Sequence, residues 1–148
     1  MNITREADYA LRVVYYLASK DRDLRINAKT ISEENDIPVD FLLKILRKLV
    51  KAGLIESHRG IRGGYVLNQK PENISLKDVI EVIDGSIFIN HCLNDSESCS
   101  FLSRFPECPL YDAFNEIQLD LTKKLASVNF KALVERRSFD FFSAKSQV

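Results

Sequence analysis

The feature that most limits how this chain can fold is the stretch of residues 27–67, in which two short helical patterns are followed by an apolar hairpin. Asn27 is a favourable N-cap for the first helix, and Pro38 suits the first turn of the second. Gly53 marks the end of the second helix. The apolar residues of the second helix recur at helical spacing and are Leu42, Ile45, Leu46 and Leu49. The pattern predicts two helices joined by a short turn, the second with one buried face.

A hairpin pattern follows the second helix. Strand-like segments at residues 54–58 and 65–67 flank a glycine-rich tip that carries Arg59 and Arg62. Helix, turn, helix and hairpin, in this order, make the winged form of the helix-turn-helix, whose second helix enters the major groove of DNA. The predicted fold is therefore mainly α-helical with a small β-hairpin. It is a winged helix-turn-helix followed by a long C-terminal helix.

The two halves of the chain differ in charge, although the whole chain is neutral. Residues 1–70 carry 13 Lys and Arg against 9 Asp and Glu, whereas residues 71–148 carry 8 against 12. Between Lys44 and Arg62 there are six Lys and Arg side chains and one acid, Glu56. Because this cationic excess coincides with the winged-helix pattern, it favours binding to double-stranded DNA over a merely solvated surface.

The residues predicted to contact DNA lie at the start of the first helix of the pair, on the outer face of the second and at the hairpin tip. They are Asn27, Lys29, Thr30, Val39, Asp40, Leu43, Lys44, Arg47, Lys48, Arg59 and Arg62. Val39 and Asp40, near the start of the second helix, are placed to read bases. The basic side chains are placed for phosphates, and the two arginines of the tip also for a narrow minor groove.

Helical patterns also flank this segment. Residues 4–19 form an amphipathic helix that Thr4 can cap, and Ser75 and Asp78 resemble a capping box at the start of another. From Pro109, apolar residues recur at intervals of three and four over about five turns. They are Leu110, Phe114, Ile117, Leu121, Leu125 and Val128.

One small domain offers no surface long enough to cover that last helix, so we expect a homodimer in which it pairs with its copy. The alternative is that the helix folds back across its own winged helix. The expected units are residues 1–85 for the winged helix, 86–108 for a cysteine-bearing loop and 109–137 for the dimerisation helix with a short terminal helix that Asn129 can cap. A flexible tail is expected at residues 138–148.

The compartment and the class of protein follow from what the chain contains. Residues 1–20 hold charges and no long apolar run, so we expect no signal peptide, no membrane anchor and a cytoplasmic protein. Three cysteines, an odd number, in a reducing compartment favour a metal site or reactive thiols over a structural disulfide. No nucleophile and base can be paired from the sequence, and we therefore expect no enzyme.

The three cysteines, Cys92, Cys99 and Cys108, are separated by six and eight residues in a segment with little regular pattern. This spacing is too wide for a zinc knuckle. An iron–sulfur cluster is held mainly by cysteines and tolerates one other ligand, so cluster ligation and unrelated free thiols are both open on spacing alone. Because Cys108 precedes Pro109, it lies at the N-cap of the long helix, where the helix dipole favours an anionic thiolate.

The chain resembles the bacterial winged-helix iron–sulfur transcriptional regulators typified by IscR, NsrR and RirA. The resemblance covers about residues 1–135. It rests on the opening ITREADYALR, the winged-helix segment ISEENDIPVDFLLKILRKLVKAGLIESHRGIRGGYVL, the helix SLKDVIEVIDG, the three-cysteine loop and the long helix. Members of this family are similar dimers that hold a 2Fe-2S or 4Fe-4S cluster through three cysteines and regulate transcription according to its state.

The resemblance implies that Cys92, Cys99 and Cys108 are cluster ligands, with 4Fe-4S favoured and 2Fe-2S possible. Some relatives supply the fourth ligand as a histidine three residues after the last cysteine, where this chain has Tyr111. Others use a carboxylate on the first helix of the partner subunit, and Asp8 stands at the matching position. Asp8 is therefore the candidate fourth ligand in trans and His91 the reserve. The alternative for Asp8 is a surface ion pair with Arg12, four residues along the same helix.

The sequence thus predicts a dimeric regulator that binds a pseudo-palindromic operator and is controlled by an iron–sulfur cluster sensing iron, nitric oxide or redox state. We expect cluster gain or loss to reorder the loop before the dimer helix and so to change the spacing of the two reading helices. Two alternatives remain open. One keeps the DNA-binding dimer but controls it by thiol–disulfide switching. The other is an iron–sulfur electron-transfer or carrier protein whose winged helix docks to a protein.

Overall fold

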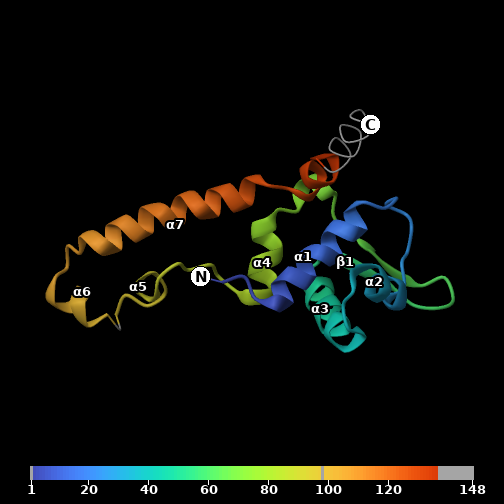
Figure 1. Cartoon of the computed structure of the whole chain (residues 1–148), viewed down its shortest axis with the longest axis horizontal. Helices are drawn as coiled ribbons and strands as arrows, with labels where there is room; N and C mark the ends of the chain where they lie inside the picture. The colour runs from blue at the N-terminus through green and yellow to red at the C-terminus, as the bar shows by residue number, and fades with distance from the viewer. Residues whose placement is uncertain (1, 98, 137–148) are drawn as a thin grey trace, which may run out of the picture.

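Helix α1 (Arg5–Ala18) packs against α4 (Leu76–Asp84) and against the helix-turn-helix pair α2 (Ala28–Asn35) and α3 (Val39–Lys51), as Figure 1 shows. The computed structural model describes residues 2–97 and 99–136. Within them the architecture is helical with a two-stranded hairpin, which confirms the fold class predicted from the sequence. The predicted tail at residues 138–148 lies outside the described residues.

The helix boundaries follow from local capping. The Thr4 hydroxyl accepts a hydrogen bond from the Ala7 N–H at 3.1 Å, and the Asn27 side-chain oxygen accepts one from the Thr30 N–H at 2.9 Å. Ser75 and its partner three residues on complete the predicted capping box of α4. Pro38 is itself the N-cap of α3, one position earlier than expected. The turn between α2 and α3 closes at Asp36, which adopts a left-handed conformation with φ of 52°.

The hydrophobic core lies where α1 and α3 meet. The four apolar residues predicted for the inner face of α3 are all buried, and α1 contributes Ala10, Val13, Val14 and Leu17. Val13 and Val14 are adjacent and both buried, because α1 contacts α2, α3, α4 and β2. Burying apolar side chains from both helices fixes α3 against α1 and leaves its opposite face to solvent.

The wing is an antiparallel pair of strands, β1 (Ile55–His58) and β2 (Gly64–Leu67), in the register that pairs Ile55 with Leu67. Ile26 extends the hairpin by one bridge, because its N–H donates to the Tyr65 carbonyl at 3.1 Å and its carbonyl accepts from the Tyr65 N–H at 2.8 Å. The segment that joins α1 to α2 is therefore tied to the base of the wing.

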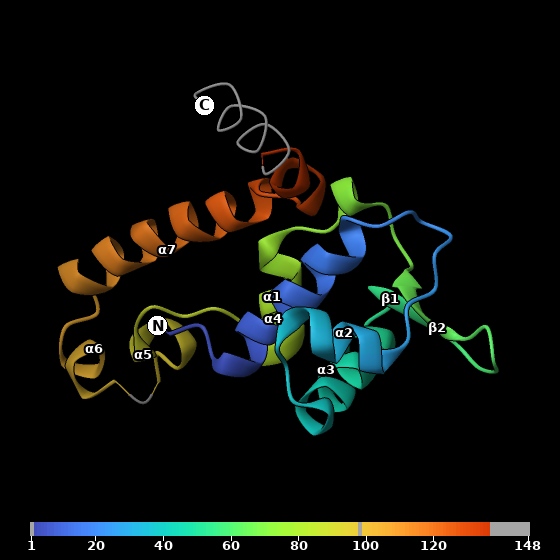
Figure 2. The same ribbon diagram turned by 45° about the vertical axis from the view of Figure 1, so that its right-hand side comes forward.

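The chain then leaves the winged helix and returns to it. After η1 (Pro71–Asn73) and α4, it forms two single-turn helices, α5 (His91–Asn94) and α6 (Ser100–Arg104), where the sequence predicted an irregular loop. The long α7 (Pro109–Ser127) follows, and Figure 2 shows it extending away from the winged helix with α5 and α6 near its N-terminal end.

After α7, the chain packs again against the winged helix through Phe130. Asn129 caps a last helix, as predicted, with its side-chain oxygen accepting from the Ala132 N–H at 2.9 Å. Phe130 is buried in the core, and its N–H donates to the Ile74 carbonyl at 3.0 Å. Both ends of the excursion are therefore anchored to one winged helix.

Helix α7 has no fully buried residue, although it contacts α4 and α5. None of its residues, all of which are described, is buried in the single chain, and Leu110, Ile117 and Leu119 are each at least half exposed. In this structure the helix contacts the winged helix at α4, and this contact buries none of the α7 residues fully. Its apolar side chains are available to a further surface, such as that of a second copy.

Two glycines of the wing allow the effect of backbone strain on stability to be distinguished from the effect of a steric clash. Gly60 and Gly64 both have positive φ, 101° and 147°, but a Cβ at Gly64 would lie 2.7 Å from the Ile26 backbone, whereas one at Gly60 would meet nothing within 4 Å. We expect Gly60→Ala to lower the free energy of unfolding by about 1 kcal/mol. We expect Gly64→Ala to lower it by about 2–3 kcal/mol, because the clash adds to the strain. Urea unfolding followed by circular dichroism measures both, and equal decreases would contradict the close approach of Ile26 to the wing.

Candidate DNA-binding face and cysteine pocket

The outer face of α3 carries most of the residues predicted to contact DNA. Asp40, Lys44 and Arg47 are exposed, as is Val39 at the helix start. Leu43 is half-buried on one flank. The exposed side chains lie opposite the buried stripe of α3, which is the arrangement a helix needs to enter the major groove.

Lys48 differs from the other basic residues of this helix. It is half-buried, and its Nζ lies 2.8 Å from a carboxylate oxygen of Glu6 on α1. No local pattern in the sequence indicates this pair, because Glu6 and Lys48 are far apart along the chain. Phe41 is the other feature that sequence reasoning missed. Its side chain is more than half exposed. Phe41 lies about two helical turns before Lys48, so the two side chains are on the same flank of α3.

The remaining predicted DNA contacts flank α3. At the start of α2, Asn27 is exposed with its side chain engaged as the N-cap, Thr30 is half-buried, and the exposed Lys29 lies 3.9 Å from Glu33. At the wing tip Arg59 and Arg62 are both exposed. No carboxylate of the described chain lies within ion-pair distance of either arginine. Two uncompensated cations on a projecting hairpin suit phosphate contacts.

The three cysteines line one pocket of about 300 Å³ between α5, α6 and the start of α7. Cys92 lies on α5, Cys99 immediately before α6, and Cys108 at the N-cap of α7, as predicted. The pocket wall is completed by Asn90, His91, Asp95, Phe101, Leu102, Leu110, Tyr111 and Phe114. Residues separated by six and eight positions in the sequence are thus brought to one apolar cavity.

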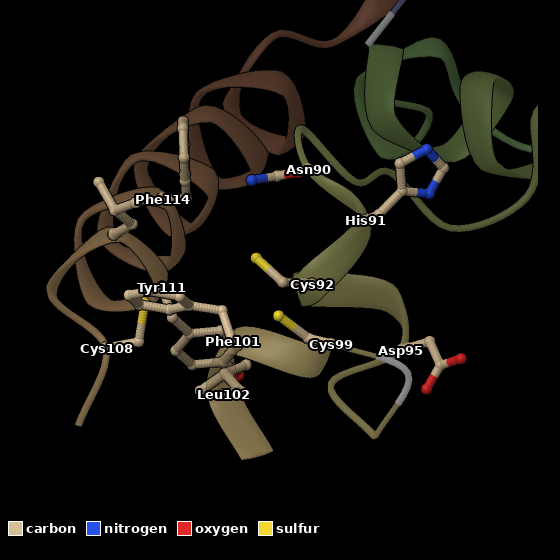
Figure 3. A pocket seen from close by; sticks show the side chains of 11 residues that line it. Asn90, His91, Cys92, Asp95, Cys99, Phe101, Leu102, Cys108, Tyr111 and Phe114 are labelled. Carbon is tan, nitrogen blue, oxygen red and sulfur yellow. The ribbon is translucent and has the colours of Figure 1, made fainter. Parts of the chain in front are cut away.

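Figure 3 shows how these side chains are directed. The side chains of Cys92 and Cys99 point in nearly the same direction, into the cavity, while Cys108 lies across the cavity beside Tyr111. Two side chains of the pocket wall could supply a fourth donor, but both point away from the sulfurs. They are His91 and Asp95. All three thiols are free, Cys108 is 6% exposed, and the other two are half-buried.

Three cysteine thiols in one cavity are the kind of donor that an iron–sulfur cluster takes. Within residues 2–97 and 99–136, no three His, Cys, Asp or Glu side chains converge on a point where one ion would be held. A cluster distributes its ligands over separate iron atoms, so its cysteines need to face one cavity rather than one point. The aromatic and aliphatic side chains of the pocket supply the apolar surroundings that limit solvent access to such a centre.

Asp8 lies outside this pocket. It forms the surface ion pair anticipated from its spacing, with its carboxylate oxygen 2.7 Å from the Arg12 guanidinium and both side chains about half exposed. Asp8 therefore ligates nothing within its own chain in this conformation. Its proposed role in trans requires a second chain and stays a prediction.

None of the described helices is long and apolar enough to cross a lipid bilayer.

A winged helix-turn-helix with a cationic second helix and a basic wing tip defines a class of protein, the DNA-binding transcriptional regulators. The chain belongs to the Rrf2 family, described as iron-dependent transcriptional regulators, which matches residues 3–136. It is a regulator and not an enzyme.

Three relatives illustrate the match. The chain is 33% identical over 116 residues to the HTH-type transcriptional regulator NsrR of Bacillus licheniformis, covering 78% of this chain and 80% of the relative. Among solved structures, a transcriptional regulator from Listeria innocua superposes with a TM-score of 0.77 at 26% identity, covering 91% of this chain and 87% of the other. The oxidized form of CymR from Staphylococcus aureus superposes with a TM-score of 0.70 at 28% identity, covering 91% and 97%.

The unequal burial of the cysteines makes a prediction for the metal-free, reduced protein. We expect iodoacetamide to label Cys92 and Cys99 faster than Cys108, because Cys108 is buried at the start of α7 whereas the other two thiols are half-buried. Peptide mass spectrometry over a time course gives the three rates, and urea-unfolded protein provides the control in which burial no longer separates them. Faster labelling of Cys108 in the folded protein would contradict the packing described here.

Proposed function

We propose that this regulator is a homodimer whose affinity for a pseudo-palindromic operator is controlled by an iron–sulfur cluster held by Cys92, Cys99 and Cys108. The observation that carries the proposal is that the three thiols line one apolar pocket at the start of α7. The description of the Rrf2 family as iron-dependent points the same way. A 4Fe-4S cluster is favoured and a 2Fe-2S cluster is possible.

The dimer is proposed from α7. Its apolar side chains are unburied in one chain over nineteen residues, and pairing with the same helix of a second copy would cover them. In this arrangement residues 1–85 bind DNA, residues 86–108 hold the cluster, and residues 109–137 associate the two chains.

We assign the fourth ligand to Asp8 of the partner subunit, with His91 as the reserve. Asp8 is half exposed on the first turns of α1, so it is accessible to another chain once its ion pair with Arg12 opens. The ring of His91 points away from the sulfurs in Figure 3, which disfavours it in this conformation. A ligand from the partner would make the cluster site depend on the dimer.

The residues of the chain itself would then act as follows. Lys44 and Arg47 approach the major groove, with Val39 and Asp40 at the helix start reading bases, while Arg59 and Arg62 contact phosphates or a narrow minor groove. When bound, the cluster supplies a centre that responds to iron, nitric oxide or redox state. The thiol of α5 and the thiol at the N-cap of α7 would both hold the cluster and so would fix these two segments relative to each other. Release of the thiols from the cluster would allow the start of α7 to move relative to the two α3 helices.

A second candidate keeps the DNA-binding dimer and controls it by a reversible disulfide. The observation that favours it is that the thiols of Cys92 and Cys99 are both free and point into the same pocket. The likeness to a CymR structure solved in an oxidized form supports it as well. The third possibility, an electron carrier, is disfavoured by the exposed cationic face of α3 and by the membership of a regulator family.

Anaerobic purification separates the two candidates. We expect a brown dimer that contains iron and sulfide, with the cluster type read from visible absorption and native mass. Asp8→Ala should lose cluster, whereas Asp21→Ala, which removes an exposed carboxylate from the loop after α1, should retain it.

Cys92→Ser, Cys99→Ser and Cys108→Ser should each lose the cluster as well. A colourless, metal-free dimer after attempted reconstitution, whose DNA affinity nevertheless changes with oxidant, would reject the cluster in favour of the disulfide.

The DNA-binding face has its own test. We expect Lys44→Ala and Arg62→Ala each to weaken binding to duplex DNA and to reduce the slope of log affinity against log salt by about one for each phosphate that is no longer neutralised. Lys131→Ala, on the last helix and exposed, is the matched control and should leave the slope unchanged. Fluorescence anisotropy at several salt concentrations measures the slopes. Slopes that are the same in all three variants would refute the assignment of α3 and the wing.

A further inference from the structure

One cationic side chain on α3 is not available to DNA in this structure. Lys48 Nζ lies 2.8 Å from Glu6 Oε1, and the two side chains are 36% and 25% exposed, so the pair is partly shielded from solvent. The other basic residues of the face, Lys44, Arg47 and Lys51, are exposed, and within the described chain none of them has a carboxylate at ion-pair distance.

The position of Lys48 on α3 explains this difference. The buried stripe of α3 faces the core, and Lys44, Arg47 and Lys51 lie opposite it. Lys48 lies on the flank that faces the first turn of α1, where Glu6 is located. A lysine stem on that flank is long enough to turn toward α1 or toward a bound duplex.

Separating Glu6 from Lys48 would carry a free-energy cost. Its Oε1 atom is buried and has no hydrogen bond of good geometry within the described residues, so Lys48 is the charge that compensates it. Moving Lys48 to a phosphate would leave a shielded carboxylate oxygen uncompensated, which is costly. The carboxylate and a phosphate therefore compete for one cation.

We infer that Glu6 sets the DNA affinity of this protein by holding Lys48 away from the phosphate backbone. The inference rests on the proposed role of α3 as the reading helix. Lys48 then contributes little to DNA binding while the pair is intact, and Glu6 acts as a positioning residue that touches no DNA itself.

The location of Glu6 gives this pair a regulatory setting. It lies in the same turns of α1 as Asp8, and Thr4, the N-cap of α1, hydrogen-bonds through its hydroxyl to the Asp84 carboxylate at 2.5 Å. Asp84 is the last residue of α4, directly before the segment that leads to the cysteine pocket. A shift of the start of α1 therefore changes the distance from Glu6 to Lys48.

A double-mutant cycle tests the inference on the full-length, metal-free protein, with a labelled duplex of random sequence as the probe. Affinity is measured by anisotropy between about 50 and 200 mM salt. We expect Glu6→Gln to raise the affinity several-fold and to steepen the salt slope by about one per lysine released. Lys48→Met should change the slope little in the unmodified protein and should abolish the increase in the Glu6→Gln background.

Glu81→Gln is the control for net charge, because Glu81 pairs at 2.9 Å with Lys77 on its own helix, α4, and not with a residue of α3. An equal rise in affinity for Glu6→Gln and Glu81→Gln would overturn the inference, since it would reduce the effect to long-range charge. A clear decrease in affinity and salt slope on Lys48→Met in the unmodified protein would also overturn the inference, and this measurement does not need Glu6→Gln to fold.

The salt slope of Lys44→Ala separates this inference from the proposed function. Suppose that Lys44→Ala reduces the slope but the effects of Glu6→Gln and Lys48→Met on affinity are additive. The assignment of α3 as the reading helix is then supported, and only the competition for Lys48 is rejected. If Lys44→Ala leaves the slope unchanged, the assignment of α3 fails, and the inference fails with it.

Discussion

The burial of one face of α3 against α1 is the interaction on which the rest of the structure depends. Leu42, Ile45, Leu46 and Leu49 are wholly buried, and removing any one such side chain typically costs about 2–5 kcal/mol. Because these residues share one face, burying them turns Lys44 toward solvent. The same packing brings the flank of α3 against the start of α1. A hydrophobic constraint thus determines which charges are free and which are paired.

The cysteine pocket has no comparable core of its own. The chain leaves the winged helix after Asp84 and is anchored again at Phe130, and between these points α5 and α6 are single turns and α7 is unburied. An excursion with so little buried apolar surface gains stability from whatever binds within it or pairs with it. A metal cluster and a second chain are both of this kind. The element that would sense a signal is therefore the one whose structure depends most on ligand and partner.

The sequence predicted the parts of the structure that local chemistry determines. The caps at Thr4, Asn27 and Asn129 and the inner face of α3 depend on residues within a few positions of one another, and the structure confirms them. The short helices α5 and α6 have too few residues to show a periodicity and were expected as loop. The pairing of Glu6 with Lys48 joins distant segments, so neither residue carries a local signal of it. The direction of the His91 ring depends on tertiary packing in the same way.

The central claim is that the state of the cysteine pocket controls the affinity for DNA. It is tested most directly by measuring one dimer preparation with its cluster intact and again after anaerobic removal of the cluster, on a duplex selected from a random pool by the loaded protein. We expect the two dissociation constants to differ by about tenfold, in the usual range for coupling between two sites. The variant with Cys92, Cys99 and Cys108 all replaced by serine should bind like the cluster-free protein. Equal affinity of the loaded and cluster-free dimers would contradict the claim.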